Sequence, residues 1–90
     1  MDDKNFCIKD LMVIPGVGKS IAEDLYNIGI RSVEDLKKSD PLALYELSNH
    51  HAGVVQDRCL LYVFRCAVYF AKTKHPNPEL LKWWNWKDKK

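Results

Sequence analysis

The chain is poor in cysteine, with three in 90 residues and no CxxC pair. An odd number of cysteines at irregular spacing does not fit a disulfide framework. Cys7, Cys59 and Cys66 also lack the short spacing of structural zinc ligands, so we expect no metal site. Reduced thiols that behave as small apolar side chains are the simpler interpretation, and they favour a cytoplasmic protein.

The chain also lacks a strong excess of one charge, because 14 Lys and Arg against 12 Asp and Glu give a net charge of +2. This balance permits binding to a polyanion, although dedicated DNA-binding domains usually carry a larger basic excess. The longest apolar run, 59–71, is interrupted by Arg65 and is too short to cross a bilayer. Residues 1–4, MDDK, are polar and acidic and do not fit a signal peptide. We therefore expect no membrane association.

No alternation of apolar and polar residues typical of a strand occurs, whereas apolar residues recur at helical spacing. Gly29 is placed to end a helix, and Ser32 and the pair Asp40-Pro41 are placed to begin helices. The segment 54–74 is apolar on nearly all sides, which is typical of a helix at the centre of a bundle. The sequence therefore predicts a compact all-α bundle of five to six short helices. We expect helices near residues 6–13, 19–28, 33–38, 41–47, 54–74 and 78–84, with a polar turn over 48–53.

Between the first two predicted helices, residues 14–20 read IPGVGKS. Gly16 and Gly18 permit a turn with backbone angles that other residues avoid. Because a helix follows directly, its unpaired N–H groups and the positive end of its dipole point outward, and Lys19 adds a full charge. These features predict an anion-binding turn, and a nucleic-acid phosphate is the natural ligand. A purely steric role, in which the glycines only turn the chain between packed helices, is the alternative.

The segment from Leu11 to Leu25, LMVIPGVGKSIAEDL, resembles the helix-hairpin-helix motif of DNA repair and replication proteins. Residues 29–36, GIRSVEDL, resemble the connector found where two such units fuse into one five-helix domain. The resemblance implies a tandem helix-hairpin-helix (SAM-like) architecture with a degenerate second hairpin, since the second copy lacks the two glycines.

Residues 81–88, LKWWNWKD, resemble a small bacterial family named for a pathogenicity locus, whose members are short single-domain proteins of unestablished activity. Residues 1–90 are accordingly expected to form one helix-hairpin-helix domain, with flexible ends at 1–5 and 87–90.

In the helix-hairpin-helix superfamily, the hairpin amides hold a DNA phosphate without reading bases. A monovalent cation on the hairpin carbonyls often assists, and no other cofactor is implied. The resemblance implies weak, salt-sensitive, sequence-independent DNA binding, because a single hairpin contacts few phosphates. Glu23 and Asp24 follow closely and would repel a phosphate chain. By position, the DNA-binding role falls to Gly16, Val17, Gly18, Lys19 and Ser20.

The C-terminal segment brings Trp83, Trp84 and Trp86 together with several lysines. Aromatic side chains interleaved with lysines can stack on unpaired bases, which makes Trp86 and Lys87 candidates for peripheral contacts. Two of the three indoles are expected to close the bundle, leaving Trp84 or Trp86 partly exposed. An exposed indole suits a protein partner equally well, so a protein-interaction domain is the alternative function.

Arg58 and Arg65 lie seven residues apart on the long predicted helix and would form one polar stripe. Salt bridges to Glu46 or Asp57 are the expected explanation. No nucleophile with a base and no carboxylate pair has a spacing suited to catalysis, so the sequence predicts no enzyme.

Overall fold

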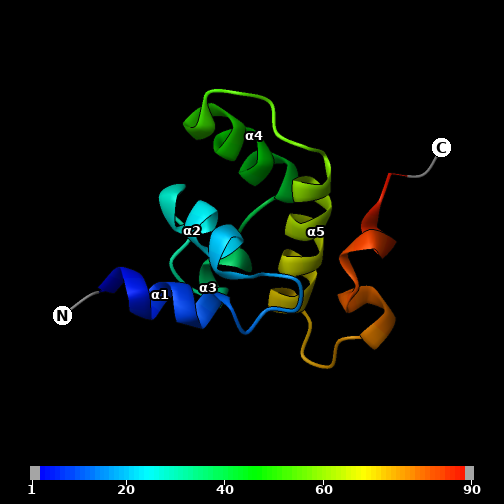
Figure 1. Ribbon diagram of the computed structural model, residues 1–90. Helices are drawn as coiled ribbons and strands as arrows, with labels where there is room; N and C mark the ends of the chain where they lie inside the picture. The colour runs from blue at the N-terminus through cyan, green and yellow to red at the C-terminus, as the bar shows by residue number, and fades with distance from the viewer. Residues whose placement is uncertain (1–2, 89–90) are drawn as a thin grey trace.

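The computed structural model describes residues 3–88 and is helical throughout, with no strand in that range. Five α-helices are followed by two short 3₁₀ helices (Figure 1). The all-α prediction is therefore confirmed. The elements are α1 (Asp3–Leu11), α2 (Lys19–Asn27), α3 (Val33–Leu36), α4 (Pro41–Ala52), α5 (Cys59–Lys72), η1 (Pro78–Leu81) and η2 (Trp83–Trp86).

Helix α5 stands at the centre of the fold, as predicted from its apolar circumference. It packs against α3 and α4 on one side and against η1 and η2 on the other (Figure 1). Phe64 and Cys66 on this helix are completely buried. The helix begins later than expected because the Asp57 carboxylate accepts a hydrogen bond from the Cys59 amide at 2.9 Å and so fixes its start. The preceding residues, 53–58, form the connection from α4.

Helix α4 begins where the sequence predicts, because the Asp40 carboxylate accepts a hydrogen bond from the Ala43 amide at 3.1 Å. The prediction that it ends near Leu47 is wrong. The helix continues through residues 48–52 and ends at Gly53, whose φ of 76° is the left-handed conformation common after helices. The Gly53 amide closes the helix by donating to the carbonyl of Asn49 at 2.9 Å.

Helix α3 is short, and side chains on both sides of its first turn hold it in place. The Ser32 hydroxyl accepts a hydrogen bond from the Asp35 amide, as the capping pattern predicts, and the Asp35 carboxylate accepts one from the Arg31 amide. The Asp10 carboxylate of α1 accepts a hydrogen bond from the Val33 amide at 3.2 Å. This last contact ties the first helix to the third.

The C-terminal segment differs from the single helix predicted near 78–84. It forms η1 and η2, and the Asn77 side chain caps η1 by accepting a hydrogen bond from the Glu79 amide. Near the ends of the chain, residues 3–5 form the first turn of α1, and Arg58 donates a hydrogen bond to Asp88. Residues 1–2 and 89–90 lie outside the described residues.

A continuous apolar core joins all five α-helices and the turn between α1 and α2. Its completely buried members include Leu11, Leu25, Leu36 and Phe64, and Ile14 of the turn is almost fully buried. The radius of gyration is 12.4 Å, close to the roughly 12 Å expected of a compact chain of this length. The turn is therefore anchored from inside, which fixes the position of its exposed backbone.

Candidate functional site

The turn between α1 and α2 contains both glycines, but only one of them needs to be glycine for its backbone angles. Gly16 has a φ of +84°, which L-residues rarely adopt. Gly18 has a φ of −90° and a ψ of −173°, an extended conformation open to any residue, and caps the start of α2. The steric explanation therefore accounts for Gly16 and leaves Gly18 without a conformational reason.

The exposed amides of this turn are the main feature of the candidate site. In α2 the first intrahelical hydrogen bond runs from the Ala22 amide to the Gly18 carbonyl at 2.9 Å. The amides of Gly18, Lys19 and Ser20 therefore precede the helical ladder. They and the Gly16 amide donate to no acceptor within residues 3–88, and all four residues are exposed. Four of the five predicted residues thus present a bare N–H group to solvent.

Val17, the fifth predicted residue, does not belong to this set. Its side chain is buried in the core, and its amide donates to the Ile14 carbonyl at 3.0 Å. This hydrogen bond closes the turn and leaves the Val17 amide unavailable to a ligand. Val17 therefore positions its neighbours instead of contacting an anion.

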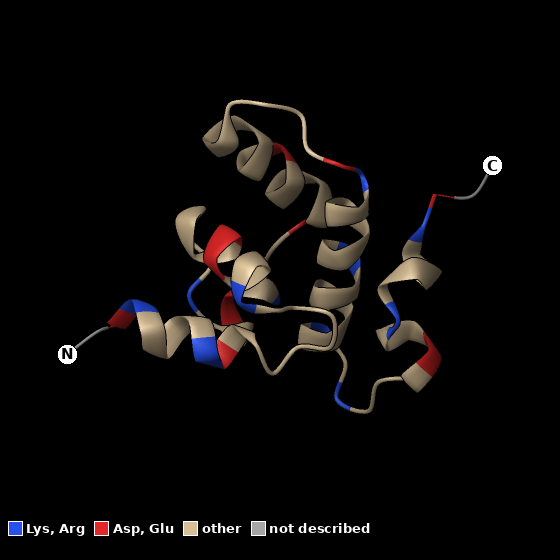
Figure 2. Cartoon of the chain, viewed as in Figure 1, with Lys and Arg blue, Asp and Glu red and all other residues tan. Residues whose placement is uncertain are grey.

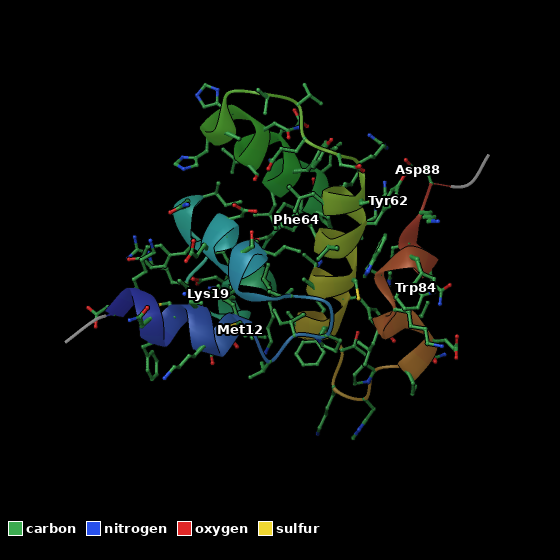
Figure 3. The ribbon with its side chains drawn as sticks, in the orientation of Figure 1. Met12, Lys19, Tyr62, Phe64, Trp84 and Asp88 are labelled. Carbon is green, nitrogen blue, oxygen red and sulfur yellow. The ribbon has the colours of Figure 1, made fainter. Side chains whose placement is uncertain are left out.

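A groove of about 330 Å³ runs beside the turn, between the end of α1 and the start of α2. Figure 3 shows Met12 and Lys19 close together at this place. Two lysine ammonium groups, one from each helix, border the groove and add positive charge near the bare amides. The lining residues are Asn5, Ile8, Lys9, Met12 and Lys19.

Two carboxylates on α2 oppose this positive charge (Figure 2). Partial burial raises the pKa of Asp24, and the neighbouring charge of Glu23 raises it further, whereas His51 of α4 acts in the opposite direction. The turn therefore lies near charges of both signs: the two lysines of the groove and the two carboxylates of α2. Such a balance is consistent with weak attraction to a polyanion.

The three tryptophans have three different environments. Trp83 is partly buried against the core, and Trp84 is 50% exposed. The indole N–H of Trp86 donates to the Leu80 carbonyl at 2.7 Å, and its ring packs 5.3 Å from that of Tyr69. Trp86, predicted as a peripheral contact, is half-buried with its indole N–H bonded within the protein, and Trp84 is the more exposed indole.

Lys87, the other peripheral candidate, is exposed beside η2. It borders a second groove, of about 590 Å³, between α5 and the C-terminal segment. Lys87 therefore lies on a different surface from the groove beside the turn, which has its own lining residues.

The polar stripe on α5 has a partner that the sequence analysis missed. Arg58 and Arg65 both pair with Asp88 of the C-terminal segment, so the prediction of Glu46 or Asp57 as partner is wrong. Asp57 instead caps α5. The arginine spacing is visible in the sequence. The partner depends on how the C-terminal segment (the tail, residues 78–88) folds, which no local pattern predicts.

Two further classes of site can be checked over the described residues. No group of three or more His, Cys, Asp or Glu side chains in residues 3–88 is arranged to hold a metal ion. Within the same range, every helix is too short or too polar to span a membrane. The Cys66 thiol is buried, which raises its pKa, and it contacts the Leu80 carbonyl at 3.5 Å. A thiol of raised pKa is poorly suited to nucleophilic chemistry.

Comparison with known proteins identifies a similar protein and a family. The chain is 34% identical over 77 residues to the mitomycin resistance protein McrB of Streptomyces lavendulae. The aligned residues make up 86% of this chain and 70% of that protein. No solved structure shows significant similarity to the chain. Residues 4–90 match the family described as Pathogenicity locus, to which the resemblance of the C-terminal segment already points. The chain therefore belongs to the Pathogenicity locus family.

Proposed function

We propose that this protein is a non-enzymatic nucleic-acid-binding module that holds the DNA backbone weakly and without sequence preference. The observation that carries the proposal is the group of four bare, exposed amides at Gly16, Gly18, Lys19 and Ser20. Backbone amides at the start of a helix are suited to phosphate oxygens, and they contact no base edge. The Lys19 side chain supplements the charge.

The proposal extends to the architecture. The turn between α1 and α2 that contains Gly16 and Gly18 is called the glycine turn below. In the proposal, a binding helix-hairpin-helix unit consists of α1, the glycine turn and α2, and the degenerate second unit consists of α4 and α5. The connection between α4 and α5 supports this difference, because the Gln56 amide donates to the Asn49 side chain at 2.9 Å. An amide satisfied inside the protein cannot hold a phosphate. A monovalent cation on the carbonyls of the glycine turn would assist the first unit.

Weak binding is expected from the charges. Glu23 and Asp24 follow the turn on α2, and the whole chain has a net charge of +2. With one binding turn the protein neutralises few phosphates, so its affinity for DNA depends on a small counterion release and falls quickly as salt is added.

Two substitutions at the turn test the proposal. Gly18→Val fits the extended backbone of Gly18, where a Cβ atom meets nothing within 4 Å, and crowds the amides with a branched side chain. Lys19→Glu reverses the charge at the same place. Both are expected to weaken binding to a short DNA duplex at low salt, measured by fluorescence anisotropy, and Lys19→Glu is expected to reduce the salt slope by roughly one.

Lys38→Glu is the matched control, because Lys38 is an exposed lysine after α3 and the substitution changes the net charge equally. If Gly18→Val and Lys19→Glu bind duplex DNA as the control does, with the same helical content by circular dichroism, the proposal is wrong.

A protein-interaction domain is the second candidate function, favoured by one observation. Trp84 is 50% exposed on the outer side of the C-terminal segment (Figure 3). A large indole on the surface is a frequent energetic centre of protein interfaces.

A further inference from the structure

The outward stripe of α5 consists of three side chains that converge on one carboxylate. Arg58 is the N-cap residue directly before α5 and has helical backbone angles. Arg58, Tyr62 and Arg65 are spaced at i, i+4 and i+7, so their side chains lie on one face at the start of the helix. Figure 3 shows Tyr62 and Asp88 side by side across the gap between α5 and the tail.

Each of the three side chains bonds to the Asp88 carboxylate. Arg58 Nε and the Tyr62 hydroxyl both donate to Asp88 Oδ2, the latter at 3.2 Å. Arg65 Nη1 lies 2.9 Å from Asp88 Oδ1 and also donates to the Trp86 carbonyl at 2.9 Å. Guanidinium groups that bind a carboxylate can also bind a phosphate, and the phenol adds a third donor to the two arginines.

The electrostatics of the cluster agree with this geometry. Hydrogen bonds from Arg58, and then from Arg65, hold the pKa of Asp88 well below its ordinary range. The same donors that favour the ionised carboxylate also favour another anion placed at that position.

The Asp88 carboxylate is held in a way that permits exchange. Side-chain exposure is 53% for Arg58, 29% for Arg65 and 37% for Asp88, so water reaches all three. Ion pairs with this exposure contribute little net stability and are screened by salt. The adjoining groove, which Lys87 also borders, gives an incoming chain room beside the tail.

We propose that Arg58, Tyr62 and Arg65 form a second phosphate-binding site, which the Asp88 carboxylate occupies as an intramolecular competitor until a nucleic-acid phosphodiester displaces it. The identity of the ligand rests on the proposed function, whereas the site itself rests on the three donors. Displacement would free Asp88 from α5, while Trp83 and Trp86 stay packed, and would add two arginine contacts to those of the glycine turn.

The first test removes the competing carboxylate. Asp88→Asn is expected to bind a short DNA duplex more tightly than the unmodified protein at low salt. Because each neutralised duplex phosphate contributes about 0.9 to the slope of log K against log salt, two released arginines should steepen the slope by roughly 1.8. Adding Arg58→Gln and Arg65→Gln to Asp88→Asn should remove the gain in affinity and in slope.

Two control variants separate this effect from a change in net charge. Glu46→Gln removes one negative charge at an exposed position of α4, and Asp88→Glu keeps a carboxylate in the tail. Both are expected to bind DNA nearly as the unmodified protein does. If Asp88→Asn gains no more affinity than Glu46→Gln, the second site is wrong.

Folding and the glycine turn are tested separately. If Asp88→Asn fails to fold by circular dichroism, Arg58→Gln with Arg65→Gln in the unmodified tail gives the answer. That variant should bind DNA more weakly than a control with Lys38→Gln and Lys72→Gln, and equal binding overturns the second site.

The gain from Asp88→Asn should persist in a Lys19→Glu background. A persistent gain together with no effect of Lys19→Glu alone would reject the glycine turn and retain the arginine site.

Discussion

Gly16 of the glycine turn lies directly against Trp83 of the C-terminal segment, and a Cβ atom on Gly16 would be 3.5 Å from Cδ1 of the indole. Trp83 in turn packs on the buried core. The turn that presents the bare amides is therefore backed by the same segment that carries Asp88.

The two glycines should respond differently to alanine. Gly16→Ala forces an L-residue into a φ of +84°, so we expect the free energy of unfolding to fall by about 1–2 kcal/mol. Gly18→Ala meets open space in an extended conformation, and we expect a change within about 0.5 kcal/mol. Urea denaturation of both variants measures the difference, and an equal loss for both would contradict the assigned backbone roles.

The connection between α4 and α5 depends on one glutamine. Gln56 Nε2 donates to the hydroxyl of the buried Ser48 at 2.9 Å. The backbone carbonyl of Gln56 accepts a hydrogen bond from the Tyr45 hydroxyl. Gln56→Ala removes the side-chain hydrogen bond to the Ser48 hydroxyl, so we expect a loss of about 1–3 kcal/mol in unfolding free energy. Val55→Ala is the control, because Val55 is 84% exposed and should change stability by no more than about 0.5 kcal/mol. Equal thermal melts for the two variants would show that the network is dispensable.

Local signals predicted the starts of helices better than their ends. Ser32 and Asp40 each cap the helix that the sequence assigns to them. Such a cap is local, because the side chain accepts a hydrogen bond from the backbone amide three residues later. The sequence does not predict the end of α4 correctly, because the polar residues 48–51 favour a turn by composition yet continue the helix. Gly53, a residue able to take positive φ, was the stronger signal.

The candidate site was predictable only where it is local. The glycine turn follows from consecutive residues, yet the engaged amide of Val17 depends on the tight closure of the turn. The pairing of Arg58 and Arg65 with Asp88 joins segments far apart in the chain. It follows from tertiary packing of the tail on α5, which neither periodicity nor capping encodes.

Asp24 should make the fold less stable at neutral pH than at a pH below the ordinary carboxyl pKa. Burial and then Glu23 raise its pKa, so the folded state holds the proton more tightly than the unfolded state. Stability is therefore lost as pH rises from the ordinary carboxyl pKa through the raised one, and the loss stays constant above it. Because Asp24 is only partly buried, we expect Asp24→Asn to gain about 0.5 kcal/mol or less at pH 7 and nothing at low pH.

Glu23→Gln provides the comparison for Asp24→Asn. It removes the second cause of the raised pKa and leaves the burial, so its gain in stability at neutral pH should be smaller. Denaturation of the two variants at several pH values measures both effects. A destabilised Asp24→Asn at neutral pH would mean that the ionised carboxylate makes a favourable contact in the folded state.

Trp84 and Trp86 should separate binding from folding. Trp86→Ala removes a ring that packs on Tyr69 and an indole N–H that bonds to Leu80, so we expect it to destabilise the protein by about 2–4 kcal/mol. Trp84→Ala removes a half-exposed ring and should change stability much less.

Binding by Trp84→Ala then tests whether the exposed indole contacts nucleic acid. If Trp84 stacks on unpaired bases, the variant should lose about 1–3 kcal/mol of binding to single-stranded DNA and keep its affinity for a duplex, whose bases are already stacked. Salt titrations on both forms of DNA measure this. Unchanged binding to single strands would exclude Trp84 from nucleic-acid contacts and favour a protein surface for the exposed indole, while the amides of the glycine turn would still account for duplex binding.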